Sequence, residues 1–269
     1  MRILATNDDG INAPGLKLLE SVLAPLVREV WVVAPETEQS ATSHSLTLRR
    51  PLRIRNMYEH RYAIDGTPTD CVLMGINEIM KDTPPDLVIS GINRGGNLGE
   101  DVTYSGTVAA AMEGTLLGIP SISFSQVYTD GHPVKWATAE KWAGKVLKKL
   151  TAEMWPQGVL INVNFPDVTA ANVTGIEIAR QGRRKIGSDL VSGTDPRGET
   201  YYWIGAQRRE EHYRKGNDLE AINRASVSVT PLTMDLTHGP TLKKLKAAEF
   251  GFPTVGFKAS AVNACSHVD

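Results

Sequence analysis

The chain has 269 residues, of which 41% are hydrophobic and 22% are charged, and its formal net charge is −1. A chain of this size can bury a sizeable core and form one large α/β domain. The near-zero charge argues against a nucleic-acid polymer or an anionic membrane as the main partner, and no apolar run is long enough to cross a bilayer.

Cysteine usage and the first residues indicate the compartment. Cys71 and Cys265 form no CxxC pair and no zinc-binding pattern, so we interpret them as two reduced thiols. The opening MRIL places a charged residue before a short strand-like run and lacks the apolar stretch of a signal peptide. We therefore expect a cytoplasmic protein.

Strand and helix patterns alternate along the first 165 residues. This alternation predicts an α/β fold with a Rossmann-like, mostly parallel sheet and helices on both faces. Ligands of such sheets bind beyond the carboxyl ends of the strands, where the strand order reverses. In chain order we expect strand 2–6, helix 15–26, strand 29–34, helix 69–80 capped by Thr69 and Asp70, strand 86–90, helix 107–117, strand 121–125, helix 137–154 and strand 159–165.

Beyond Asp167 the pattern changes to strands at 176–179, 201–204, 226–230 and 255–258 without long helices between them. We interpret this part as a β-rich extension of a single domain covering 1–269, with an arm at about 180–224. The run YYWI at 201–204 has no obvious core left to cover, and an isolated two-stranded ribbon is marginal in water. The run therefore packs either against a second subunit or back on its own domain.

The strongest local motif is NDDG at 7–10, directly after the first expected strand. Adjacent Asp8 and Asp9 would repel each other and lose hydration unless a cation compensates them, and a hard divalent ion with oxygen ligands is the simplest compensation. Gly10 allows a sharp turn and a close approach to a ligand. The alternative is that one of the aspartates merely caps the following turn.

Two further segments follow expected strands. SATSHSLT at 40–47 is dense in hydroxyl groups that could ligate a metal or donate to a phosphate. SGINRGGNLGED at 90–101 has glycines whose backbone N–H groups could form an anion-binding nest, and it leads to a helix start with Ser105, Gly106 and Thr107. Each could also be an ordinary polar loop. The chain has no P-loop, no GxGxxG after the first strand, no GxSxG and no HExxH.

Taken together, these segments resemble the survival protein E (SurE) family of nucleotidases. The likeness runs in order over nearly the whole chain, through RILATNDDGINAPG at 2–15, VVAPETEQSATSHSLT at 32–47, GTPTDCV at 66–72, DLVISGINRGGNLGEDVTYSGTVAAAMEG at 86–114 and SVSVTPLTMDLT at 226–237. The resemblance implies a metal held by Asp8, Asp9, Ser40 and Asn93. It also places Asn97 and Ser105 near the phosphate.

The resemblance further implies one Mg²⁺ or Mn²⁺ per subunit and a nucleoside 5′- or 3′-monophosphate as substrate. It implies a homodimer or homotetramer in which a projecting hairpin is exchanged between subunits. This favours the interpretation that the run at 201–204 packs against a second subunit. We expect no nucleic-acid polymer and no membrane among the partners.

The expected chemistry is hydrolysis of a phosphate monoester by a metal-activated water at Asp8 and Asp9. Asn97 and the helix start at Ser105, Gly106 and Thr107 would hold the phosphate oxygens. Two alternatives stay open. Asp8 or Asp9 could form an aspartyl-phosphate, although phosphatases of that kind favour a DxD spacing. The chain could also be a non-enzymatic module that binds nucleotide.

Overall fold

The computed structural model describes residues 1–153, 155–184, 190–204 and 213–248. The chain divides into two compact units, Met1–Met234 and Asp235–Asp269. The described part of the second unit carries one helix, α6 (Gly239–Ala247). The strand expected at 255–258 and Cys265 lie outside the described residues, whereas Cys71 is a buried free thiol.

The first unit is built on a nine-stranded sheet in the order β3-β4-β2-β1-β5-β6-β7-β11-β8. The run from β4 to β7 is parallel, β3 and β11 are antiparallel to their inner neighbours, and β8 is parallel to β11. This confirms the predicted mostly parallel α/β fold. The strands are β1 (Arg2–Thr6), β2 (Glu29–Pro35), β3 (Ile54–Tyr58), β4 (Arg61–Ile64), β5 (Leu87–Arg94), β6 (Ser121–Gln126), β7 (Val159–Phe165), β8 (Gly175–Ile178) and β11 (Ser226–Thr233).

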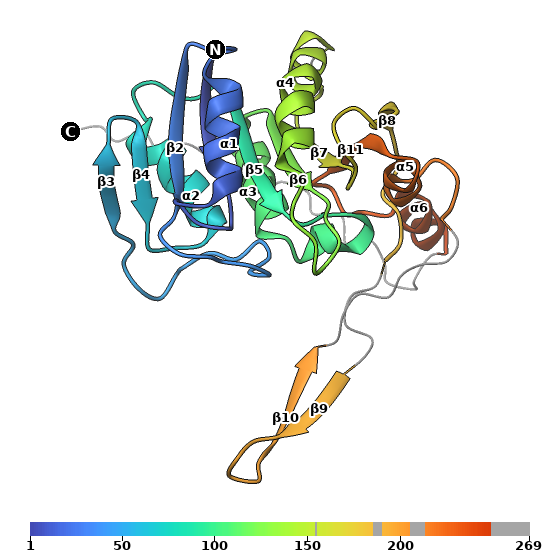
Figure 1. The fold of residues 1–269 in the computed structure, drawn as a ribbon. Coiled ribbons are helices and arrows are strands. Elements are labelled where there is room, and N and C mark those ends of the chain that lie inside the picture. The colour runs from blue at the N-terminus through green and yellow to red at the C-terminus, as the bar shows by residue number, and fades with distance from the viewer. Residues whose placement is uncertain (154, 185–189, 205–212, 249–269) are drawn as a thin grey trace, which may run out of the picture. The chain divides into compact units, whose positions relative to one another are not determined.

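Helices cover both faces of the sheet, with α1 and α4 in front of it in Figure 1 and α2 and α3 behind. Successive residues of β1 serve opposite layers: Ile3 and Ala5 pack with Leu16 of α1, whereas Leu4 packs with Val72 of α2. This is the alternation that a strand buried on both faces requires. The helices are α1 (Pro14–Leu23), α2 (Pro68–Met74), η1 (Gly75–Ile79), η2 (Gly99–Thr103), α3 (Gly106–Leu116), α4 (Trp136–Glu153) and α5 (Asp218–Asn223).

The strand order reverses at β1, which lies between β2 on one side and β5 on the other. In this register Thr6 lies opposite Ser90, so the NDDG loop and the SGIN segment leave the sheet next to each other. This is the switch point at which doubly wound sheets bind ligands.

The helix expected at 69–80 differs from the structure in its cap and in its length. The N-cap is Thr67, not Thr69 and Asp70: the Asp70 N–H donates to Thr67 Oγ1 at 3.1 Å, and Asp70 Oδ2 accepts from the Thr67 N–H at 2.8 Å. This reciprocal capping box satisfies two backbone donors. Regular α-helix ends at Met74, and a π-helical turn over Gly75–Ile79 follows.

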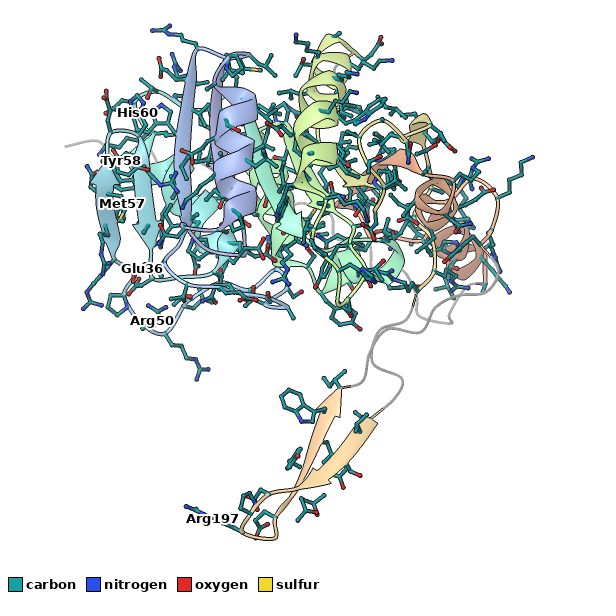
Figure 2. The ribbon with its side chains drawn as sticks, viewed as in Figure 1. Glu36, Arg50, Met57, Tyr58, His60 and Arg197 are labelled. Atoms are coloured by element: carbon teal, nitrogen blue, oxygen red, sulfur yellow. The ribbon has the colours of Figure 1, made fainter. Side chains whose placement is uncertain are left out.

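The strands β3 and β4 were absent from the sequence-based expectation. β3 lies at the edge of the sheet, where Met57 and Tyr58 are exposed (Figure 2). Its side chains show no alternation between buried and exposed positions, because every residue from Ile54 to Tyr58 is exposed. A strand of this kind has no period-two pattern by which it could be found.

A separate antiparallel hairpin pairs β9 (Leu190–Thr194) with β10 (Thr200–Ile204), and Arg197 lies at its turn (Figure 2). Its apolar side chains are exposed, Trp203 to 69% and Ile204 to 73%. By contrast α5, which also falls within the expected arm at 180–224, has Leu219 and Ala221 buried. The unpartnered apolar surface of the described arm is therefore the hairpin itself.

No helix among the described residues is long and apolar enough to span a membrane.

Candidate active site

Three loops meet where β1, β2 and β5 end. The Gln39 N–H donates to the backbone oxygen of Asp8 at 2.8 Å, which holds the segment after β2 against the NDDG loop. The Arg94 N–H donates to Asp9 Oδ2 at 3.2 Å, which ties the end of β5 to the same loop. Ser40 and Asn93 are the sequence neighbours of these two donors. The four residues expected to hold a metal therefore come from loops that contact one another.

Asp8 is buried against the start of α3. Its side chain is 5% exposed, and its Oδ1 accepts a hydrogen bond from the Thr107 hydroxyl. A Cβ on Gly106 would lie 2.8 Å from the Asp8 Cβ, so only glycine permits this approach. Burial raises the Asp8 pKa from its usual 3.8 to about 6; the Thr107 hydrogen bond opposes this, and the neighbouring Asp9 adds to it.

Asp9 is partly exposed and faces the end of β5. Burial raises its pKa as well, the Arg94 N–H lowers it, and the Glu38 carboxylate raises it. The positive charge of Arg94 also lowers the Asp9 pKa, yet the pKa values of both adjacent carboxyl groups stay raised. This is the electrostatic condition that a bound cation would relieve.

Ser40 is exposed, and the loop that it begins is tied to the segment directly before α3. The Ser40 hydroxyl donates to Glu38 Oε1 at 2.7 Å, which leaves its lone pairs able to face a cation. Further along, the Ser43 N–H donates to the backbone oxygen of Tyr104 at 3.1 Å, and the Ser43 hydroxyl donates to the backbone oxygen of Thr103 at 2.8 Å. These bonds fix the loop beside α3, which a polar sequence alone does not reveal.

Asn93 and Asn97 occupy different environments. The Asn93 side-chain nitrogen donates to the Gly95 oxygen at 3.0 Å, so its amide oxygen is the atom able to ligate a cation. Asn97 is 6% exposed, and its side-chain nitrogen donates to Ser125 Oγ at 2.8 Å. The Asn97 N–H also donates to Asn164 Oδ1 at 2.8 Å.

A buried polar network therefore supports Asn97, and the sequence reading did not include it. The side-chain nitrogens of Asn162 and Asn164 of β7 both donate to the backbone oxygen of Asn97, at 2.8 and 3.1 Å. The Ser123 hydroxyl of β6 donates to Asn162 Oδ1. Polar residues at alternate positions of two otherwise apolar strands are the signal that could have indicated it.

The start of α3 is the candidate phosphate site. Ser105 is its N-cap and its Oγ accepts from the Val108 N–H at 3.0 Å, which leaves the hydroxyl proton available. The N–H groups of Gly106 and Thr107 have no partner within the helix, as in any first turn. Thr107 serves Asp8 with both its hydroxyl and its backbone N–H, so the Ser105 hydroxyl and the Gly106 N–H are the donors of this helix start that remain for an anion.

The donor set fits a hard divalent cation. No group of three or more His, Cys, Asp or Glu side chains suited to a metal occurs in the described part of the chain. The candidate set is instead two carboxylates, one hydroxyl and one amide oxygen, which suits Mg²⁺ or Mn²⁺ and not zinc. Next in sequence to Asp8, the buried Asn7 Oδ1 has no hydrogen-bond partner among the described residues.

The fold and this site define a doubly wound α/β protein with an oxygen-lined acidic site at its switch point. Residues 3–188 match the family model for survival protein SurE. A 5′-nucleotidase SurE from Paramagnetospirillum magneticum is 63% identical over 248 residues, which are 92% of this chain and 95% of the relative. A second one, from Parvibaculum lavamentivorans, is 56% identical over 251 residues, 92% of this chain and 91% of the relative.

Among solved structures, the SurE protein from Aquifex aeolicus superposes with a TM-score of 0.82 at 42% identity. The superposition covers 93% of this chain and 100% of that protein. The chain belongs to the survival protein SurE family, as the sequence motifs implied.

Proposed function

We propose that this protein is a divalent-metal-dependent phosphomonoester hydrolase that removes phosphate from nucleoside 5′- and 3′-monophosphates. The observation that carries the proposal is the buried Asp8 carboxylate, held by Thr107 against the helix start that would receive a phosphate. The 5′-nucleotidase names of the relatives support the nucleotide substrate. Action on 3′-monophosphates rests on the family resemblance.

Asp8, Asp9, Ser40 and Asn93 would hold one Mg²⁺ or Mn²⁺ per subunit. A divalent ion bound there would supply charge neutralisation at the phosphate and a water of lowered pKa. A cation there would offset the burial that is the main cause of the raised Asp8 pKa, and also the smaller repulsion from Asp9.

The chain's own groups would bind and orient the phosphate. The Ser105 hydroxyl and the Gly106 N–H can donate to its oxygens, and the electropositive start of an 11-residue helix favours its charge. Thr107 would act by orienting Asp8 beside the phosphate. Asn97 is held rigidly at the edge of this region by its hydrogen bond to Ser125. Donors fixed in advance stabilise charge in the transition state without a cost of reorganisation.

Water is the proposed nucleophile, in preference to an aspartate. Asp8 is almost completely buried and one of its oxygens already accepts the Thr107 hydroxyl. Asp9 has one oxygen on the Arg94 N–H. Each carboxylate is thus already engaged at one oxygen, and both would be metal ligands. A water nucleophile predicts that no phosphoenzyme accumulates during turnover.

The test is phosphate release from a panel of nucleoside 5′- and 3′-monophosphates at equal concentration with added Mn²⁺, with p-nitrophenyl phosphate as the non-nucleotide reference. We expect turnover of nucleotides to exceed that of the reference. A panel in which no nucleoside monophosphate is hydrolysed would contradict the proposal. It would favour the alternative that the protein binds nucleotide without catalysing a reaction.

We also propose that the β9–β10 hairpin is exchanged between subunits of a homodimer or homotetramer. Its exposed aromatic and aliphatic side chains leave an apolar surface that a second copy could cover, at little cost in new structure. A cytoplasmic location is supported by Cys71, which is a buried free thiol in the described part of the chain.

A further inference from the structure

A cavity of about 730 Å³ lies beside the glycine-rich loop that follows β5. Its walls are Glu100, residues 180–183 and residues 214–217. None of the residues assigned above to metal or phosphate binding lines it. Its volume is in the range of sites for small organic ligands.

Hydrogen bonds between backbone groups hold the walls together. The Arg180 N–H donates to the Gly216 oxygen at 2.9 Å, and the Asp218 N–H donates to the Arg180 oxygen at 2.9 Å. The fully buried Asp218 carboxylate accepts from the N–H groups of Gly99 and Gly182, at 2.9 and 2.8 Å. The shape of the cavity is therefore set by the fold before any ligand arrives.

The lining is strongly basic in a chain whose net charge is only −1. Arg180, Arg183, Arg214 and Lys215 face a single acidic residue, Glu100. Arg183 lies 3.8 Å from that carboxylate. For the other three cations, no ion pair occurs among the residues that the structure describes.

Like charges gathered in one cavity repel one another, and an anion relieves that repulsion. Arginine guanidinium groups bind phosphate oxygens in a bidentate manner. A ligand with a single carboxylate would neutralise only one of the cations in the cavity. The three cations that form no ion pair within the described residues match the charge of a diphosphate group better than that of a monophosphate.

We propose that this cavity is a binding site for a ligand that carries a diphosphate group, separate from the candidate active site. No nucleophile or metal-ligand set lines it, so the ligand is bound and not turned over there. The inference does not depend on the proposed phosphatase activity.

Inorganic pyrophosphate is the probe, and calorimetric titration of the full chain in the presence of EDTA is the measurement. The test variant is Arg180→Glu/Arg214→Glu, and the matched control is Lys148→Glu/Lys149→Glu on the exposed side of α4. All four side chains are exposed, so folding should persist and is checked by thermal melting. We expect binding at least tenfold weaker in the test variant and within twofold of wild type in the control.

Two further arms locate the site and its ligand class. Asp9→Asn should bind pyrophosphate as wild type does, because Asp9 does not line the cavity. ADP should bind and adenosine should not, since recognition goes through phosphate. The inference is overturned if wild type binds no pyrophosphate up to about 1 mM, or if the Arg180→Glu/Arg214→Glu variant binds it as well as wild type does. It is also overturned if Asp9→Asn abolishes pyrophosphate binding, or if adenosine binds as tightly as ADP.

Discussion

Replacing Asp8 by asparagine should stabilise the metal-free protein at neutral and alkaline pH. The pKa of the buried carboxyl is about 6 in the folded chain against its usual 3.8, a difference of about 2.2 units. At about 1.4 kcal/mol per unit, the ionised side chain costs the fold about 3 kcal/mol. Asparagine keeps an oxygen that can accept the Thr107 hydroxyl, but it adds N–H donors whose burial offsets part of the gain.

The sign of the pH dependence follows from this raised pKa. The folded state holds the Asp8 proton more tightly than the unfolded state, so the contribution of Asp8 to the stability of wild type falls as the pH rises from about 4 to about 6 and is constant above. The advantage of Asp8→Asn should therefore be absent near pH 4 and fully present at pH 8. We expect a net gain of about 1–2 kcal/mol, or about 2–8 °C in Tm for a chain of this size.

The assay is thermal unfolding in EDTA at several pH values between 4 and 8, with Asp130→Asn on an exposed loop as the control. Asp130→Asn should follow wild type throughout. Excess Mn²⁺ should reverse the order, because wild type gains the free energy of metal binding and the variant loses a ligand. An Asp8→Asn variant that is less stable than wild type in EDTA at pH 8 would refute the electrostatic reasoning.

Three other predictions concern the same site and the arm. Thr107→Val keeps the volume but removes the donor to Asp8, and it should lower the turnover number in a phosphate-release assay by about tenfold; an unchanged rate would show that this bond is dispensable. Gly106→Ala places a Cβ in contact with Asp8 and should lower activity at least as much as Thr107→Val does. In the control Gly175→Ala the added Cβ meets no atom within 4 Å, so activity should not change. Equal rates for the two alanine variants would contradict the argument that Gly106 must lie close to Asp8. Replacing residues 190–204 by a short glycine-serine turn should give a smaller oligomer by light scattering; an unchanged subunit number would exclude the hairpin as the assembly element.

The parallel strands β1, β2, β5, β6 and β7 were predictable from the sequence because burial on both faces leaves continuous apolar runs such as ILA at 3–5. The switch point was predictable too, since the unusual residues cluster directly after those runs. The contact of Thr107 with Asp8 was not, because it joins residues 99 positions apart and depends on how α3 packs.

Other parts of the structure lack any local signal. Arg61 is 4% exposed within β4, where its guanidinium pairs with Glu20 and donates to the Ile11 oxygen. A charged residue at that position argues against a buried strand when only the sequence is read. The partners that make it tolerable lie 41 and 50 positions away, so only the tertiary fold reveals them.

The central claim is that the buried Asp8 and the partly exposed Asp9 at the switch point serve a divalent cation in phosphate monoester hydrolysis. The most direct test is phosphate release from a nucleoside 5′-monophosphate by wild type and by Asp9→Asn, each assayed in EDTA and again with excess Mn²⁺ or Mg²⁺. We predict that wild type is inactive in EDTA and recovers with metal, and that folded Asp9→Asn is at least about a hundredfold slower under all conditions. Full wild-type activity after exhaustive chelation, or near wild-type turnover by Asp9→Asn, would contradict the claim.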